Sequence, residues 1–131
     1  MFSRKMTEKN QVYKCSVCGN VVSVIENGVG VLVCCDQDMK LLNIKKEEEG
    51  KEKHIPVVSV EGNKVHVKVG SVEHPMEEKH YIERIELFKG NKLVGQFQLN
   101  YTEKPEADFC VDNPEGIKAR IFCNVHGLWS N

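Results

Sequence analysis

The sequence predicts an all-β protein that consists of a small metal-stabilised domain, residues 1–42, and an antiparallel β-sandwich, residues 43–131. Three observations lead to this prediction. Four cysteines gather in a first segment that is too short to build a core of its own. A run of charged residues then interrupts the pattern, and short alternating segments separated by turn signals fill the remainder.

The overall composition fits a compact protein without a nucleic-acid or membrane partner. The chain has 131 residues, 40% of them hydrophobic, which is enough for one ordinary core and a small appendage. Lys and Arg number 18 against 19 Asp and Glu, so no excess of positive charge is available for nucleic acid or an anionic membrane. No stretch approaches the roughly 18 apolar residues of a membrane span.

The N-terminal residues and the cysteine count indicate a cytoplasmic protein. Polar residues follow Met1–Met6 where a signal peptide would place its apolar segment. In the reducing cytoplasm, the six cysteines point to metal-binding or redox thiols more than to disulfides.

The first domain is expected to contain little regular structure. Residues 1–10 are predicted to be a flexible extension. Apolar and polar residues alternate briefly over 20–26 and 30–33, and Asn27-Gly28 between them is a hairpin-turn signal. A metal must therefore supply much of the stability of this segment.

Residues 44–53 carry eight charges in ten positions and are predicted to be a solvated linker. From His54 onward the pattern is that of β-strands. Val65, Val67 and Val69 share one face of a strand, as do Leu93, Phe97 and Leu99 in a later segment. Alternation continues through 108–112 and 118–123, and turn signals occur at 61–63, 89–91 and 113–116. About seven short strands with this spacing favour an antiparallel sandwich.

The first candidate metal site is formed by Cys15-x2-Cys18 and the adjacent pair Cys34-Cys35. A Cys-x2-Cys turn with a second pair of thiolates returning from a strand is typical of a tetrahedral four-sulfur site. Neighbouring residues on a strand point to opposite faces, so the adjacent pair can bind one ion only if the chain is distorted there. The spacing alone leaves structural zinc and redox-active iron open.

The second candidate site draws on scattered residues, namely His54, His74, His80, Cys123 and His126. Four imidazoles and one thiolate exceed a closed tetrahedral zinc site and fall one short of an octahedron, so one position is left for a small molecule. His66 alternates outward between two valines and is not included. Cys110 belongs to neither set and is interpreted as a plain thiol.

These motifs resemble a known family. Cys15–Asn20 with Val33-Cys34-Cys35 is similar to the desulforedoxin-type domain. Three further blocks, His54-Ile55-Pro56, Glu73–Ile82 and Cys123–Trp129, are similar to the superoxide reductase core. Together they resemble desulfoferrodoxin, the two-iron class of superoxide reductase, from about Gln11 to Trp129.

The resemblance implies a desulforedoxin-like metal domain followed by an immunoglobulin-like antiparallel β-sandwich, with two irons per subunit. It implies that the four cysteines of the first set hold a rubredoxin-like iron, which is structural or relays electrons. It further implies that the four histidines form the equatorial plane of the second iron, with Cys123 as the axial thiolate.

The implied activity is that of an oxidoreductase that detoxifies superoxide during oxidative stress. Superoxide takes one electron and two protons and leaves as hydrogen peroxide, without release of dioxygen. By the same resemblance, Lys53 attracts the substrate and supplies protons through water, and Glu52 occupies the sixth position of the oxidised iron. Rubredoxin or a similar small protein is the expected electron donor, and a homodimer is the expected assembly.

Two other functions remain open from the sequence. One is a structural two-zinc protein that binds a partner through its sandwich. The other is an electron carrier that uses only the rubredoxin-like site. The metal content and colour of the purified protein distinguish the three, because a colourless two-zinc protein excludes the enzyme.

Overall fold

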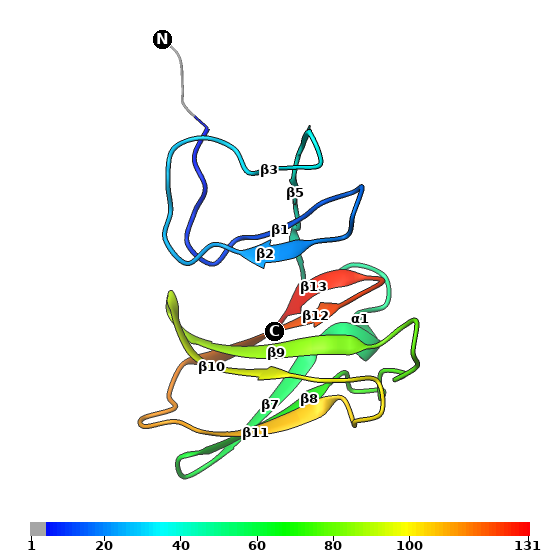
Figure 1. The fold of residues 1–131 in the computed structure, drawn as a ribbon. Helices are drawn as coiled ribbons and strands as arrows, with labels where there is room; N and C mark the ends of the chain where they lie inside the picture. Colours follow the sequence, from blue (N-terminus) through cyan, green and yellow to red (C-terminus); the bar gives the residue numbers. More distant parts are fainter. Residues whose placement is uncertain (1–4) are drawn as a thin grey trace. The chain divides into compact units, whose positions relative to one another are not determined.

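The computed structural model describes residues 5–131, which form two compact units that divide between Asn43 and Ile44 (Figure 1). Nearly all of the regular structure is β, which confirms the predicted fold class. The division lies one residue beyond the predicted boundary. Among the described residues, no helix is long and apolar enough to cross a membrane.

The first unit contains a three-stranded antiparallel sheet in the order β2-β1-β5 and a two-stranded hairpin, β3-β4. The strands are β1 (Val12–Lys14), β2 (Val21–Ser23), β3 (Val33–Cys34), β4 (Gln37–Asp38) and β5 (Lys40–Leu41).

The predicted hairpin around Asn27-Gly28 is wrong, because β2 pairs with β1 and the 27–29 segment pairs with the N-terminal residues instead. Met6 forms a bridge with Val29. The Thr7 amide donates to the Gly28 carbonyl at 2.9 Å, and the Gly28 amide donates to Thr7 Oγ1 at 2.9 Å. The second half of the predicted flexible extension is thus hydrogen-bonded, while residues 1–4 lie outside the described part of the chain.

The second unit is a sandwich of two sheets (Figure 1). One has five strands in the order β10-β9-β12-β13-β6, and the other has three in the order β11-β8-β7. The strands are β6 (Ile44–Lys45), β7 (Pro56–Glu61), β8 (Lys64–Val69), β9 (Ile82–Lys89), β10 (Lys92–Gln98), β11 (Glu106–Cys110), β12 (Ile117–Cys123) and β13 (Gly127–Ser130). The seven strands β7–β13 pair antiparallel, as predicted, whereas β6 joins β13 in parallel.

The alternation of the sequence places most of the core correctly. Val65, Val67 and Val69 are fully buried between the sheets with Ile85, Leu87, Ala119 and Ile121. Strand β10 is the exception, because its register shifts between Leu93 and Gly95. Val94 therefore packs against the core, while Leu93 and Phe97 are 37% and 42% exposed.

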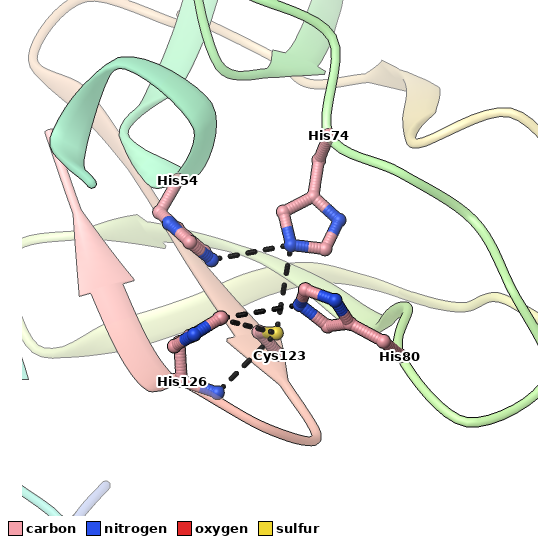
Figure 2. A group of neighbouring side chains, drawn as sticks. All are labelled: His54, His74, His80, Cys123 and His126. Carbon is pink, nitrogen blue, oxygen red and sulfur yellow. Dashed lines mark hydrogen bonds between the residues drawn. The ribbon is translucent and has the colours of Figure 1, made fainter.

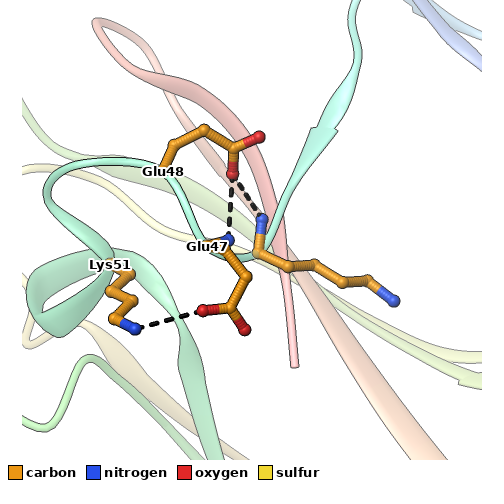
Figure 3. A network of polar contacts seen from close by, with 4 residues as sticks. Glu47, Glu48 and Lys51 are labelled. Atoms are coloured by element: carbon orange, nitrogen blue, oxygen red, sulfur yellow. Dashed lines mark hydrogen bonds and ion pairs between the residues drawn. The ribbon is translucent and has the colours of Figure 1, made fainter.

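The charged segment is ordered at both ends (Figure 3). Its first residues form β6, and its last form the single-turn helix α1 (Lys51–His54). Between them, the Glu48 carboxylate accepts the amides of Lys46 and Glu47 at 2.8 and 3.0 Å, and Lys51 pairs with Glu47 at 3.1 Å. The predicted solvated linker is therefore limited to a short turn between β6 and α1.

Gly70 allows the chain after β8 to pack tightly against α1. Its φ is +83°, and a Cβ at this position would lie 2.4 Å from the Val72 carbonyl oxygen and 2.7 Å from that of Lys53. The Val72 amide also donates to the Glu52 carbonyl at 2.9 Å. These contacts fix the helix that carries His54.

Replacement of Gly70 by Ala is expected to destabilise the second unit by about 3 kcal/mol, because left-handed strain adds to a backbone collision. Gly116→Ala is the matched control, since Gly116 has a φ of +77° and nothing within 4 Å of the added Cβ. Its cost should be about 1 kcal/mol. Thermal unfolding of the metal-loaded variants measures both, and equal losses would contradict the tight packing at Gly70.

Candidate metal centres

The four cysteines of the first unit form a cluster whose sulfurs all lie within 4.8 Å of one another. Cys15 and Cys18 lie on the turn that follows β1, and Cys34 and Cys35 lie at the end of β3. The Cys34 sulfur is 3.6 Å from that of Cys18 and 3.9 Å from that of Cys35. A tetrahedron of sulfurs about 2.3 Å from a metal has edges near 3.8 Å, so these separations fit one four-sulfur ion.

The conformation of Cys35 explains how two adjacent cysteines can face one ion. Cys34 is the last residue of β3 and pairs with Gln37, so Cys35 and Asp36 form a two-residue turn. Their φ values of 52° and 60° are left-handed. The distortion that the adjacent pair requires is therefore supplied by a turn in which the side chains no longer alternate as on a strand.

The pKa values of the cysteines in this cluster differ widely. Hydrogen bonds from the backbone amides of Cys18 and Val17 lower the pKa of Cys15 to about 6. Contact with the Cys18 and Cys15 sulfurs raises the pKa of Cys35 to about 12. Repulsion between neighbouring thiolates prevents all four crowded sulfurs from losing their protons together. A bound cation removes this repulsion, so the four cysteines fit a metal site.

The second group contains all five residues that the sequence singled out, and their donor atoms also lie within 4.8 Å of one another. Figure 2 shows the four rings and the sulfur pointing toward one centre. His54 ends α1, His74 and His80 come from the loop between β8 and β9, and Cys123 ends β12. His126 lies in the turn that leads to β13.

Short separations between the donors define the centre. His74 Nε2 is 3.1 Å from His54 Nε2, and His80 Nε2 is 3.2 Å from His126 Nδ1. The Cys123 sulfur lies 3.6 Å from His74 Nε2 and 3.8 Å from His126 Nδ1. The donors therefore comprise two imidazole pairs and one sulfur.

Hydrogen bonds outside the centre fix two of the imidazoles. His54 Nδ1 donates to the Gly50 carbonyl at 2.8 Å, and His74 Nδ1 donates to the Pro75 carbonyl at 2.6 Å. Each Nδ1 carries the proton, so both Nε2 atoms present lone pairs to each other across 3.1 Å. Two facing lone pairs repel each other unless a shared proton or a cation lies between them. A metal ion bound by both Nε2 atoms meets this requirement.

Burial makes a shared proton between these two nitrogens unfavourable. It lowers the pKa of His74 to about 4 and lowers the pKa values of His54 and His126. These three imidazoles are thus neutral near pH 7, which is the form that binds metals. Burial raises the pKa of the Cys123 thiol, while its contact with the His126 amide at 3.4 Å opposes that rise.

Three residues that sequence reasoning missed support this group. Asn124 Oδ1 accepts the Tyr81 amide at 2.9 Å, and its Nδ2 donates to the Lys79 carbonyl at 3.1 Å, so one side chain holds the backbone on both sides of His80. The Trp129 ring stacks on His54 with centroids 4.6 Å apart. Lys45 donates to the His126 carbonyl at 2.9 Å. Asn124 and Trp129 lie within the Cys123–Trp129 block that carries the resemblance, but their contacts are with residues distant in sequence, and nothing in the sequence singled out Lys45.

The two other predicted site residues, the resting ligand Glu52 and the steering residue Lys53, lie outside the five-donor group. Glu52 and Lys53 are exposed on α1, immediately before His54. Lys53 lines an open groove that also includes His74, Tyr101 and Lys104. His66, which the sequence excluded, instead contacts Asp108 at 2.7 Å on the neighbouring strand, and Cys110 is exposed and free.

The sequence matches the models of two protein families. "Desulfoferrodoxin, N-terminal domain" covers residues 7–42, and "Desulfoferrodoxin" covers residues 46–131. A desulfoferrodoxin homolog from Archaeoglobus fulgidus is 56% identical over 126 residues, which span 96% of this chain and 99% of that protein. Desulforedoxin from Megalodesulfovibrio gigas is 56% identical over 34 residues, 26% of this chain and 92% of that protein.

The fold is also similar to solved structures. The superoxide reductase from Treponema pallidum aligns with a TM-score of 0.72 at 29% sequence identity, over 99% of both chains. A one-iron superoxide reductase from Giardia intestinalis aligns with a TM-score of 0.56 at 39% identity, over 62% of this chain and 96% of that one. Both the sequence matches and the arrangement of the two sites therefore lead to one conclusion: this chain belongs to the desulfoferrodoxin family.

Proposed function

We propose that this protein is a superoxide reductase. In the proposed reaction, one superoxide takes up one electron and two protons and leaves as one hydrogen peroxide, with no dioxygen formed. The observation that carries the proposal is the convergence of His54, His74, His80 and His126 with Cys123 on one centre. The names of the similar solved structures support the same activity.

The proposed resident metal is iron at both sites. Iron at the five-donor site would supply the single electron by passing from the ferrous to the ferric state. The four imidazoles hold the site without adding negative charge, and the Cys123 thiolate favours a redox-active ion over a hard one. Five donors leave room for one more ligand, which a closed structural zinc site does not need.

Lys53 and Glu52 are proposed to act on the substrate and on the oxidised metal, respectively. Superoxide is an anion, and the exposed Lys53 ammonium beside the His74 groove would raise its local concentration and pass protons through water. Glu52, two residues before His54, would ligate the oxidised centre. Its carboxylate is outside the five-donor group, so this role requires the Glu52 side chain to move toward the centre.

We also propose a role for the first site, an electron donor and a cellular compartment. We assign the four-cysteine site a structural or electron-relay role, with rubredoxin or a similar small protein as donor. All six cysteines are free of disulfides, which fits a reducing cytoplasm. Exposed Val17, Ile25, Val29 and Val33 on the first unit would suit a homodimer contact.

Rapid mixing of the ferrous protein with superoxide tests the central activity. One equivalent of hydrogen peroxide and no dioxygen are expected per superoxide consumed. Dioxygen release would indicate a dismutase. A colourless two-zinc protein without turnover would support the structural alternative, and iron confined to the cysteine site would support the electron carrier.

Lys53→Ala should lower the second-order rate with superoxide by about threefold or more at low ionic strength, and should flatten its salt dependence. Lys51→Ala is the matched control, because Lys51 lies on the same helical turn but is paired with Glu47. Stopped-flow rates over a salt series measure the effect. A rate and salt profile equal to those of the unchanged protein would remove the steering role.

Glu52→Ala should change the visible spectrum of the ferric five-donor centre while leaving the ferrous rate nearly the same, because the carboxylate is proposed to bind only the oxidised form. Glu49→Ala, in the same charged segment, serves as the control. Identical ferric spectra before and after the Glu52 change would show that this residue is only part of the helix.

Cys18→Ser should remove one equivalent of metal and the spectrum of the four-cysteine site, while superoxide reduction by the five-donor site largely persists. Cys110→Ser should bind as much metal as the parent, since Cys110 is outside both groups. Elemental analysis and turnover measure this division. Complete loss of turnover with the second metal still bound would contradict it.

A further inference from the structure

We propose that Lys45 is a positioning residue of the five-donor site, which fixes the His126 turn and Trp129 and raises the reduction potential of the bound iron. This inference rests on the proposed function only in taking the metal to be iron. Lys45 is part of β6, which supplies none of the five donors and does not line the groove beside Lys53 and His74.

Lys45 is placed by strand pairing. β6 joins β13 in parallel, and Lys45 is in register with Trp129. Its Nζ lies 5.4 Å from the centroid of the Trp129 ring, within the range of a cation–π contact. The side chain is half-buried, so its charge is less screened than that of an exposed lysine.

The His126 carbonyl is the first point of contact with the site. It accepts Lys45 Nζ at 2.9 Å and Trp129 Nε1 at 3.1 Å. A carbonyl oxygen has two lone pairs, so these two donors satisfy it fully. The backbone of the turn that carries His126 is thereby held from outside the centre, whereas the Gly50 and Pro75 carbonyls hold the rings of His54 and His74 themselves.

Trp129 provides a second contact with the site. The indole is 1% exposed and stacks on the His54 ring with centroids 4.6 Å apart and planes 15° apart. Lys45 therefore reaches two of the four imidazoles, His126 through its carbonyl and His54 through the indole. Neither route needs Lys45 to change its protonation state.

A fixed positive charge beside a redox centre favours the state that carries less positive charge, which for iron is the ferrous state. The ammonium of Lys45 donates directly to the His126 carbonyl and lies over the indole that stacks on His54, so its charge is close to two of the donor rings.

Lys45 and Lys53 thus have separable roles. Lys53 is exposed beside the groove on the His74 side, where an approaching anion would meet it. Lys45 contacts the His126 turn and the stacked indole instead. Removal of Lys53 should alter a salt-dependent rate, and removal of Lys45 should alter an equilibrium potential.

A redox titration of the iron-loaded full chain, followed by the spectrum of the five-donor centre, tests this inference. Lys45→Met keeps an unbranched apolar stem but removes the terminal charge, and should shift the ferric–ferrous equilibrium about tenfold toward ferric, or about 59 mV lower. Lys45→Arg should stay within about twofold of the parent. Lys46→Met removes the neighbouring exposed charge and should leave the potential unchanged.

The outcomes separate Lys45 from the function of the site. An unmoved potential in Lys45→Met, or an equal shift in Lys46→Met, overturns the role of Lys45 even if superoxide turnover is intact. A centre that shows no ferric–ferrous couple overturns it as well. A parent protein that titrates as expected but does not reduce superoxide overturns the proposed function and leaves the result for Lys45 standing.

Discussion

Two imidazole nitrogens, His54 Nε2 and His74 Nε2, face each other across 3.1 Å with their lone pairs turned inward. Their opposite ring nitrogens donate to backbone carbonyls, so neither ring can turn its N–H toward the other without losing a short hydrogen bond. Burial also disfavours protonation of both rings. The site therefore requires a cation between these rings. The surrounding structure keeps the two Nε2 atoms close together although their lone pairs repel.

The sandwich delivers the donors from several elements. A single helical turn, a loop between the two sheets, the end of β12 and the turn before β13 each supply one or two. Gly70 packs against the helix, Asn124 holds the backbone on both sides of His80, and Trp129 stacks on His54. The stability of the sheets is thus linked to the geometry of the centre, because most supporting contacts begin on a strand or at its end.

The sequence predicted the fold class, the strand alternation and the four-cysteine group, because thiolate spacing and period-two burial are local patterns. It failed where distant segments compete for the same partner. The residues near Asn27-Gly28 pair with Met6 and Thr7 instead of forming a hairpin, and a bulge in β10 exposes Leu93 and Phe97. The roles of Lys45 and Trp129 were also hidden, since they depend on the parallel pairing of β6 with β13.

Residue type and strand alternation selected these five scattered residues and left out His66, the resemblance assigned them to one iron, and the structure brings them within 4.8 Å of one another. The most direct test of the account is X-ray absorption at the iron edge on ferrous Cys18→Ser protein, in which only the five-donor site should hold iron. Four nitrogens and one sulfur are expected around the iron. A shell without sulfur, or with four sulfurs, would contradict this expectation.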